Sequence, residues 1–320
     1  MNSKERYTNF CQTTYIPIFS KPWWLDAAVG EENWDVFVLE KSGMLCAALP
    51  YYLTNRDGYK IITKAPNTQN NGIIINYPEG QKAITKLDYE EKCITACCDY
   101  IESLGLDKYE QQYHYSFQNW LPFFWRYYKE ITRYTYVVDT SKSIEEIESC
   151  YAANLRKNLR KAHKIVSLSK DEISIDKFFE VNRMSFNRQG KEIPYSLDFV
   201  KRIYTACKEH DACKIFCAED EAGNIHSVAL LVWDEKSAYY LLNGTDPKYK
   251  ASQANDFLID EAIKFSKNKG LLFDFEGSVI RPIEHAFREF GGERKAYFRI
   301  YKTFNKELLK KELEEQLSQV

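Results

Sequence analysis

The spacing of apolar residues along the chain predicts alternating strands and helices, which is the pattern of a mixed α/β protein. The stretch Leu271–Gly292 shows this most completely, because a short apolar run is followed by a turn and then by a helical repeat. Pro282 suits the first turn of that helix, and Gly291-Gly292 suits its end. Ligand-binding residues of α/β enzymes commonly lie at such strand ends, so we expect functional residues here.

Two carboxylates, Asp274 and Glu276, interrupt the apolar part of this stretch. They alternate with Phe273 and Phe275, so a strand here would turn both carboxylates to one face and both rings to the other. Burying a carboxylate is costly unless a partner compensates it. Two explanations follow: the carboxylates serve a reaction, or Asp274 caps or pairs with a neighbouring element while Glu276 is exposed.

The remaining elements are predicted in the same way, helices from apolar residues spaced three and four apart and strands from alternating or continuous apolar residues. Before residue 139 the pattern predicts strands at 34–39, 44–53, 59–64, 72–76, 109–115 and 134–138, with a helix at 87–104. After it, a capping box formed by Ser143 and Glu146 begins a long helix that reaches about Lys164. The second half is completed by helices at 176–188, 196–209 and 253–269 and by strands at 213–219, 226–234, 237–243 and 295–301. A chain of 320 residues is long enough for two domains, which we place at 1–139 and 140–320.

Composition excludes several classes of protein. Charged residues make up 28% and aromatic residues 15% of the chain, which is typical of an ordered globular protein. A net charge of −2 argues against broad non-specific binding of nucleic acid and leaves a local basic patch open. Nine cysteines without a C-x-x-C pair and five histidines without ligand spacing predict reduced thiols and no metal site. The lack of a long apolar run predicts a soluble, cytoplasmic protein with no integral membrane segment, and leaves peripheral contact with a membrane surface open.

A run of cations lies on the helix expected after Ser143, opposite its apolar stripe. Its members are Arg156, Lys157, Arg160, Lys161 and Lys164. With no acid between them, these side chains repel one another unless an anion lies nearby. A phosphate-bearing ligand would satisfy them, such as coenzyme A, the acceptor stem of tRNA, or a nucleotide- or lipid-linked sugar. A solvated helix face is the alternative, and most charge runs are of that kind.

Several of these segments together resemble the FemAB-like branch of the GNAT acyltransferase superfamily. The likeness rests on the basic segment 155–162, on the strand, loop and helix of 243–258, and on Phe273–Ser278 with Phe290-Gly291-Gly292. Residues 18–25 are similar to the opening of these proteins. The resemblance implies an α/β fold with mixed sheets in two tandem GNAT-like domains, of which the second carries the active site.

Members of this family transfer an acyl or aminoacyl group to an amine. The resemblance therefore implies an acyltransferase that takes its group from acyl-CoA or aminoacyl-tRNA, uses no metal, and meets the acceptor end of tRNA in the second case. Its substrate would be a small-molecule or precursor amine on a cell-envelope or sugar-linked compound. The segment 248–254 departs from the family, because it stands where a glycine-rich pyrophosphate loop is usual and contains no glycine. The amides of a helix N-terminus can still hold an anion there.

The resemblance also implies roles for particular residues. The donor phosphate would be bound by Arg156, Arg160, Lys161, Ser252, Gln253 and Asn255. The donor carbonyl would lie against Asn243, Gly244 and Thr245, although Asn-Gly is also a common turn dipeptide. The amine would be handled by Asp274 and Glu276, with Tyr249 as a general acid. Substrate would be contacted by Ser278 and Tyr297.

Two other functions stay open from the sequence. A module that keeps the fold without turnover would bind a nucleotide-sugar or RNA; the loop without glycine favours it, and the two carboxylates disfavour it. A dedicated tRNA-binding factor would show binding that falls steeply with salt. Replacing Asp274 by Asn separates an enzyme from a binding module, because only an enzyme would lose rate at unchanged ligand affinity.

Overall fold

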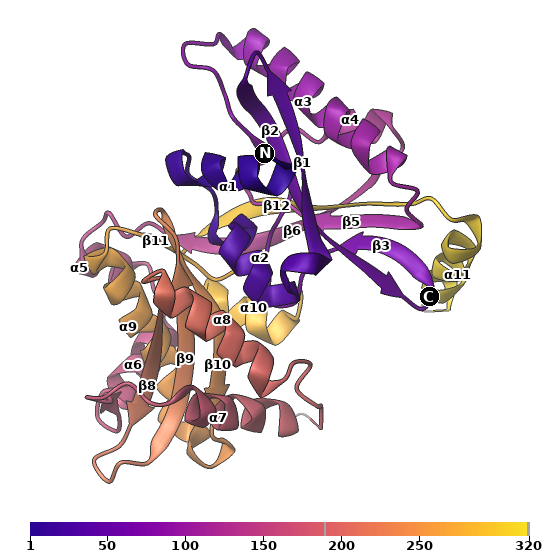
Figure 1. Ribbon diagram of the computed structural model, residues 1–320. Coiled ribbons are helices and arrows are strands. Elements are labelled where there is room, and N and C mark those ends of the chain that lie inside the picture. Colours follow the sequence, from indigo (N-terminus) through magenta and orange to yellow (C-terminus); the bar gives the residue numbers. More distant parts are fainter. Residues whose placement is uncertain (189, 319–320) are drawn as a thin grey trace. The chain divides into compact units, whose positions relative to one another are not determined.

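The computed structural model describes residues 1–188 and 190–318, and the chain folds into two compact units. One unit comprises Met1–Arg133 together with Ala296–Val320, and the other comprises Tyr134–Lys295. Figure 1 labels the elements of each unit. The boundary falls within strand β6 (Lys129–Val138) instead of after residue 139, and the carboxy-terminal segment belongs to the first unit.

The first unit is built on a sheet with the strand order β1-β2-β3-β5-β12. Its strands are β1 (Trp34–Lys41), β2 (Met44–Arg56), β3 (Tyr59–Thr63), β5 (Lys108–Gln112) and β12 (Glu293–Thr303), and β4 (Ile74–Ile75) pairs with β2. Its helices are α1 (Ser3–Thr13), α2 (Pro22–Val29), α3 (Ala83–Ser103), α4 (Leu121–Trp125) and α11 (Lys306–Leu317), with short 3-10 turns η1 (Ile18–Ser20) and η2 (Glu31–Asn33). The expected hairpin is confirmed, because β1 and β2 are antiparallel around Ser42-Gly43, where both residues have positive φ.

Strand β12 explains why the last residues fold with the first unit. Arg299–Thr303 pairs antiparallel with Lys108–Gln112 of β5. The backbone N–H groups of Phe304 and Asn305 then donate to the carbonyl oxygen of Asp107. Pairing between segments this far apart in the chain leaves no mark in local periodicity, so the sequence pointed to one continuous second domain, 140–320.

The second unit contains a sheet with the order β6-β11-β10-β9-β8-β7. Besides β6, its strands are β7 (Ser167–Leu168), β8 (Cys213–Glu219), β9 (Ile225–Trp233), β10 (Ser237–Thr245) and β11 (Leu272–Asp274). Its helices are α5 (Ile144–Ser149), α6 (Ala153–Ala162), α7 (Ile175–Asn187), α8 (Leu197–Glu209), α9 (Ala254–Asn268) and α10 (Arg281–Arg288), with the 3-10 turn η3 (Pro247–Ser252). Strands β10 and β11 are parallel, whereas the other pairs in this unit are antiparallel.

Helices cover both faces of the second sheet (Figure 1). Helices α6 and α9 pack on one face, where Leu155, Phe257 and Ile263 meet Leu231 and Tyr240 of the strands in one apolar core. Helices α7 and α8 lie on the other face. Alternation along β9 and β10 therefore gives each layer of helices its own set of apolar side chains.

The long helix expected from Ser143 is two helices, α5 and α6, and its capping box is confirmed. The interruption at 150–152 arises because backbone groups there bond outside a helical ladder. Ala152 N–H donates to the carbonyl oxygen of Glu289 (2.8 Å), and Arg156 Nη1 donates to the carbonyl oxygen of Tyr151 (2.7 Å). Helical periodicity continued across the break, so the sequence did not reveal it.

Candidate functional site

Strands β10 and β11 pair over only three residues and then diverge. Ser237–Tyr239 lies parallel to Leu272–Asp274, after which β10 continues to Thr245 beside β9. The chain after β11 follows β6 instead, as the N–H of Phe275 donates to the carbonyl oxygen of Tyr136 (3.1 Å). Strands that stop pairing in this way present backbone polar groups to a ligand at the point of divergence.

Asp274 lies at this point and is buried, with 3% of its surface exposed. Its Oδ1 accepts hydrogen bonds from Thr135 Oγ1 (2.5 Å) and from the backbone N–H of Glu276 (2.8 Å). Burial raises the pKa of Asp274 to about 6; the two hydrogen bonds oppose the shift, and the nearby charge of Asp234 adds to it. Asp274 therefore fixes the turn after β11, which is the capping role considered from the sequence, and it titrates close to neutral pH.

Glu276 and Gly277 form a left-handed turn directly after Asp274, with φ of 60° and 75°. A Cβ at Gly277 would overlap the carbonyl oxygen of Tyr134, so only glycine fits. Strand alternation ends at Asp274, and it is this turn that sets the direction of the half-buried Glu276 side chain. Phe275 keeps its expected place in the core.

The raised pKa of Asp274 predicts a pH-dependent stability. The carboxyl has an ordinary pKa near 3.8 and a folded pKa of about 6, so the folded state binds its proton more tightly than the unfolded state. This contribution is complete below pH 3.8 and is lost as pH rises through 6. From pH 4 to pH 7 the wild type should lose about 2 kcal/mol of unfolding free energy relative to Asp274→Asn, which does not titrate. Urea denaturation of both proteins measures the difference, and parallel pH profiles would contradict it.

Three of the expected site residues lie in or beside the carboxy-terminal half of β10. Asn255, in the first turn of α9, accepts hydrogen bonds at Oδ1 from Asn243 Nδ2 (2.8 Å) and from Tyr240 OH (3.1 Å). Gly244 lies against α7, where a Cβ would overlap the backbone of Asn182. The structure thus brings Asn243 and Asn255 together and explains Gly244 by the close approach of a helix.

Backbone groups of this segment already have partners in α7 and β9. The carbonyl oxygen of Asn243 accepts from Asn182 Nδ2 (2.6 Å), and that of Gly244 accepts from Ser227 Oγ (2.7 Å). The N–H of Thr245 donates to Ser185 Oγ (2.9 Å). These bonds tie the end of β10 to its surroundings.

Tyr249 is stacked on a buried histidine that the sequence did not single out. Its ring lies 4.1 Å from that of His226, with 6° between the planes. His226 Nε2 lies 3.2 Å from Asp220 Oδ2, and hydrogen bonds led by that from Asn224 lower the pKa of Asp220 to about 2. The stack fixes the conformation of η3. Nothing in the spacing of the five histidines could have revealed His226, because its partners lie in a hairpin and a 3-10 turn.

Tyr249 and Asp274 lie at opposite ends of β10. Asp274 is level with Tyr239, and Thr245 lies six residues farther along the strand. At about 3.3 Å per residue this separation is roughly 20 Å. Tyr249 is therefore not close enough to act on the same atoms as Asp274 and Glu276.

The basic end of α6 lies beside the first turn of α9. Asn158 Nδ2 donates to Asp256 Oδ2 (3.0 Å), and the ring of His163 lies 5.1 Å from that of Phe257. Gln253 precedes α9 in a left-handed conformation (φ 62°), and its side chain makes no capping hydrogen bond. The end of α6, with its exposed cations, and the first turn of α9, which also carries Asp256, are therefore neighbours, and cations beside the amides of a helix N-terminus suit an anion.

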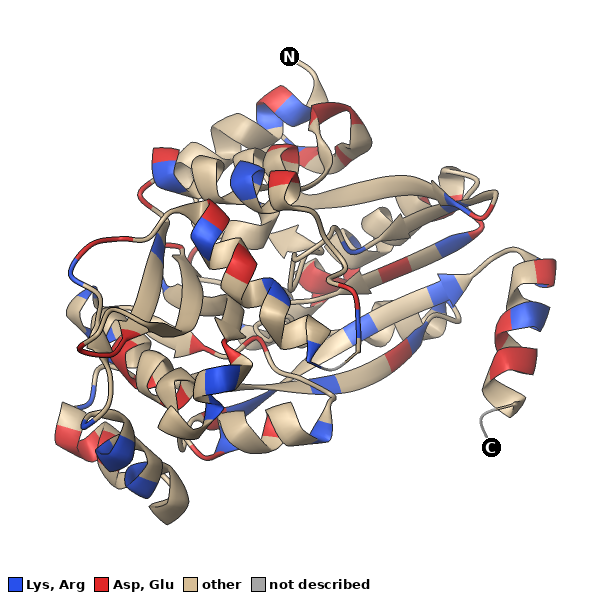
Figure 2. Ribbon diagram, turned by 90° about the horizontal axis from the view of Figure 1, so that it is seen from below, with Lys and Arg blue, Asp and Glu red and all other residues tan. Residues whose placement is uncertain are grey.

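The charge of α6 is unusual for this protein. Most helices carry both acidic and basic residues (Figure 2). Helix α6 carries Arg156, Lys157, Arg160 and Lys161 and no acid. Arg160 and Lys161 are exposed in its last turn, whereas Arg156 lies at the other end and binds the backbone of Tyr151.

The other expected residues have local partners. Ser252 is buried and donates from Oγ to the carbonyl oxygen of Tyr249 (2.7 Å), so it stabilises η3. Ser278 Oγ accepts from the N–H of Ile280 (3.1 Å) before α10. Tyr297 belongs to the first unit, where its hydroxyl accepts from Gln69 Nε2 (3.3 Å). Thr135, which holds Asp274, gave no signal in the sequence because it precedes its partner by 139 positions.

Residues 1–188 and 190–318 contain no group of three or more His, Cys, Asp or Glu side chains arranged to hold a metal ion. No helix among them is both long enough and apolar enough to cross a membrane.

One family model matches most of the second unit. Residues 150–281 match a family model described as an acetyltransferase (GNAT) domain. No curated protein matches the chain.

Solved structures with similar folds cover nearly the whole chain. FemX superposes with a TM-score of 0.71 and 12% identity, over 97% of this chain and 98% of that one. L-PGS from Bacillus licheniformis has a TM-score of 0.52 and 11% identity, over 88% and 87%. A tandem GNAT protein from the clavulanic acid biosynthesis pathway has a TM-score of 0.50 and 9% identity, over 84% and 82%. The expected fold class, a mixed α/β architecture of two tandem GNAT-like domains, is confirmed.

Proposed function

We propose that this chain, whose residues 150–281 form a GNAT acyltransferase domain, transfers an acyl or aminoacyl group from a phosphate-bearing donor to an amine. The observation that carries the proposal is the divergence of β10 and β11 beside the turn Asp274–Gly277. The donor is acyl-CoA or aminoacyl-tRNA, and the amine belongs to a cell-envelope or sugar-linked precursor. Another similar structure, the C-terminal domain of a putative lysylphosphatidylglycerol synthetase from Agrobacterium fabrum (TM-score 0.56, 11% identity, over 87% and 86%), supports by its name an aminoacyl group and an envelope-related acceptor.

The two carboxylates at the turn remove the proton of the attacking amine, one directly and one by positioning the other. Transfer forms a bond between the amine nitrogen and the donor's carbonyl carbon and breaks the bond from that carbon to the donor's sulfur or oxygen. The amine must lose a proton, which the half-buried Glu276 accepts, and the leaving group takes up a proton as it departs. Asp274 positions Glu276, because its Oδ1 holds the Glu276 backbone N–H.

Strand β10 supplies the surface against which the donor carbonyl lies. A bulge between Tyr240 and Leu242 leaves Leu241 outside the pairing with β9, just beyond the last residue that pairs with β11. Backbone groups at such a bulge can point at a ligand. Asn243–Thr245 continues this surface toward α9, and its bonds to α7 and β9 keep it rigid.

The donor phosphate binds between α6 and the start of α9. Arg160 and Lys161 supply charge, and the first turn of α9, next to Gln253 and Asn255, supplies backbone amides. A glycine-rich loop is replaced here by η3 and the left-handed Gln253, held in place by Ser252 and by the stack of Tyr249 on His226. We therefore assign Tyr249 to donor binding and Ser278 to acceptor binding.

A transfer assay with labelled acyl-CoA and labelled aminoacyl-tRNA, run side by side over a panel of amine acceptors, tests the function. Transfer from one of the two donors is expected. Failure of both donors with every acceptor would leave the non-catalytic binding module as the explanation. Mass spectrometry of ligands that copurify with the protein would narrow the panel.

Removing the charge at the end of α6 should weaken donor binding. We expect Arg160→Gln with Lys161→Gln to raise the donor KM about tenfold with little change in kcat, because two exposed cations each contribute up to about 1 kcal/mol. The difference should shrink at high salt. Steady-state kinetics at two salt concentrations measures both effects.

The matched control removes two exposed lysines elsewhere, Lys177 and Lys201, which pair with Glu180 and Asp176. Lys177→Gln with Lys201→Gln changes the net charge equally, and the donor KM should stay near that of the wild type. An equal rise in KM for both double variants would mean that total charge, and not the end of α6, sets donor affinity.

A further inference from the structure

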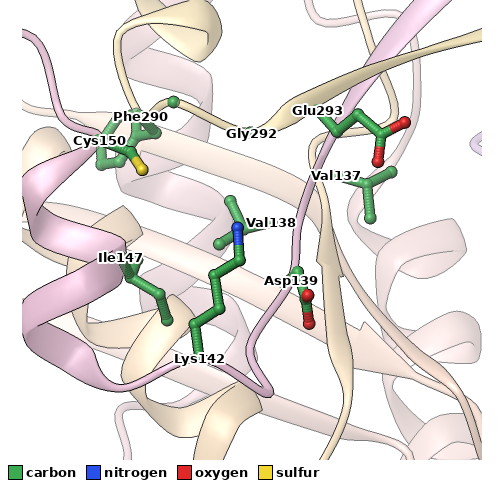
Figure 3. Close-up of a pocket in the computed structure, with 10 residues that line it drawn as sticks. Val137, Val138, Asp139, Lys142, Ile147, Cys150, Phe290, Gly292 and Glu293 are labelled. Atoms are coloured by element: carbon green, nitrogen blue, oxygen red, sulfur yellow. The ribbon is translucent and has the colours of Figure 1, made fainter.

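A hollow lies in the second unit, and its lining includes none of the residues assigned to the transfer site. It has a volume of about 260 Å³ and is enclosed by the end of β6, by α5 and by the segment that precedes β12 (Figure 3). Val138, Ile147 and Phe290 form its apolar wall. Because drug-sized ligands occupy pockets of roughly 300–1,000 Å³, this hollow suits a smaller molecule.

One ammonium group projects into this pocket. The side chain of Lys142 extends toward Val138, so that its Nζ lies over the apolar wall (Figure 3). Within 1–188 and 190–318, Lys142 forms no ion pair, and its charge helps to lower the pKa of the nearby carboxylates of Asp139 and Glu146. The carboxylate of the neighbouring Asp139 binds within its own loop. Its Oδ1 accepts hydrogen bonds from the backbone N–H (3.0 Å) and the Oγ (2.7 Å) of Ser141. The cation is thus available to a ligand.

The thiol of Cys150 lies at the edge of the same pocket. Figure 3 shows its sulfur directed inward from the end of α5. Cys150 is exposed, whereas seven of the other cysteines are buried and Cys11 is partly so. A ligand in the pocket would therefore cover a thiol that reagents otherwise reach.

We propose that this pocket binds a small aliphatic monocarboxylate, with its carboxylate on Lys142 Nζ and its hydrocarbon chain against Val138, Ile147 and Phe290. A single charge is favoured over a phosphate dianion, since there is one ammonium and the carboxylates of Asp139 and Glu293 also line the pocket. The site is distinct from the transfer site, because neither Asp274 nor Glu276 lines the pocket, although Val137, which pairs with Asp274, does.

Protection of Cys150 from alkylation tests the proposal on the full-length chain. Butyrate is the probe, and the rate of iodoacetamide labelling at Cys150 is followed by peptide mass spectrometry. At about ten times its Kd, butyrate should slow labelling roughly tenfold by mass action. Butyramide, which has the same shape without charge, should protect far less. L-Valine should also protect less, because Lys142 repels its ammonium group.

Variants of Lys142 establish which group binds the carboxylate. Lys142→Gln should raise the Kd for butyrate about tenfold or more, because a hydrogen bond to a charged group is lost, while Lys142→Arg should retain protection. The proposal fails if butyrate leaves the labelling rate unchanged, if butyramide or L-valine protects equally, or if Lys142→Gln is protected as well as the wild type. The readout requires no acyl donor, so it is independent of the transfer assay.

Discussion

Replacing Glu276 by glutamine is expected to slow acyl transfer about 10²–10⁴-fold, the usual range for removal of a general base. The substitution keeps the size of the side chain and the left-handed backbone at φ 60°, and it removes the group that we propose accepts the amine proton. Donor affinity should be unchanged, because the proposed phosphate site lies at the far end of β10. Single-turnover kinetics and donor titration measure the two quantities separately.

The comparison with Asp274→Asn assigns roles to the two carboxylates. An asparagine Oδ1 can accept the same hydrogen bonds from Thr135 and Glu276, so the turn should survive. We expect a smaller loss of rate and a shifted pH–rate profile, since the group that titrates near pH 6 is gone. If Asp274→Asn abolishes transfer and Glu276→Gln leaves it within a few-fold of the wild type, Asp274 is the base and the roles are reversed.

Replacing Gly277 by alanine should have the largest effect on stability. The position requires φ of 75°, which costs an L-residue about 1–2 kcal/mol, and the new Cβ would overlap the carbonyl oxygen of Tyr134. Displacing packed backbone adds about 1–3 kcal/mol. We expect a loss of about 3–4 kcal/mol, a large share of the stability of an ordinary domain. Urea denaturation followed by circular dichroism measures it.

Gly223→Ala is the control for the contribution of φ alone. Gly223 has nearly the same φ, 78°, and a Cβ there would meet no atom within 4 Å. Its replacement should cost only about 1–2 kcal/mol. Equal losses for the two variants would show that the approach of Tyr134 to Gly277 is relieved by a small movement, and the turn after β11 would then be less constrained than the geometry indicates.

The turn after β11 shows which features the sequence can predict and which only the structure reveals. Glycine at 277 and the polar break after Phe275 were visible in the sequence, because turn chemistry depends on a few consecutive residues. The burial of Asp274 and its bond to Thr135 were not visible, because they depend on strands far apart in the chain. The same holds for His226, whose partners Asp220 and Tyr249 are brought to it by a hairpin and a 3-10 turn.

The sequence by itself determined the order of strands and helices, the mixed α/β class and the resemblance to GNAT acyltransferases, since periodicity and turn residues act over a few positions. Only the tertiary structure decided that Ala296–Val320 folds with the first unit, that Asn243 meets Asn255, and that Tyr249 and Asp274 lie at opposite ends of β10. Those facts follow from pairing between distant segments. Such pairing is selected by the burial of whole faces, so no single stretch of the chain records it.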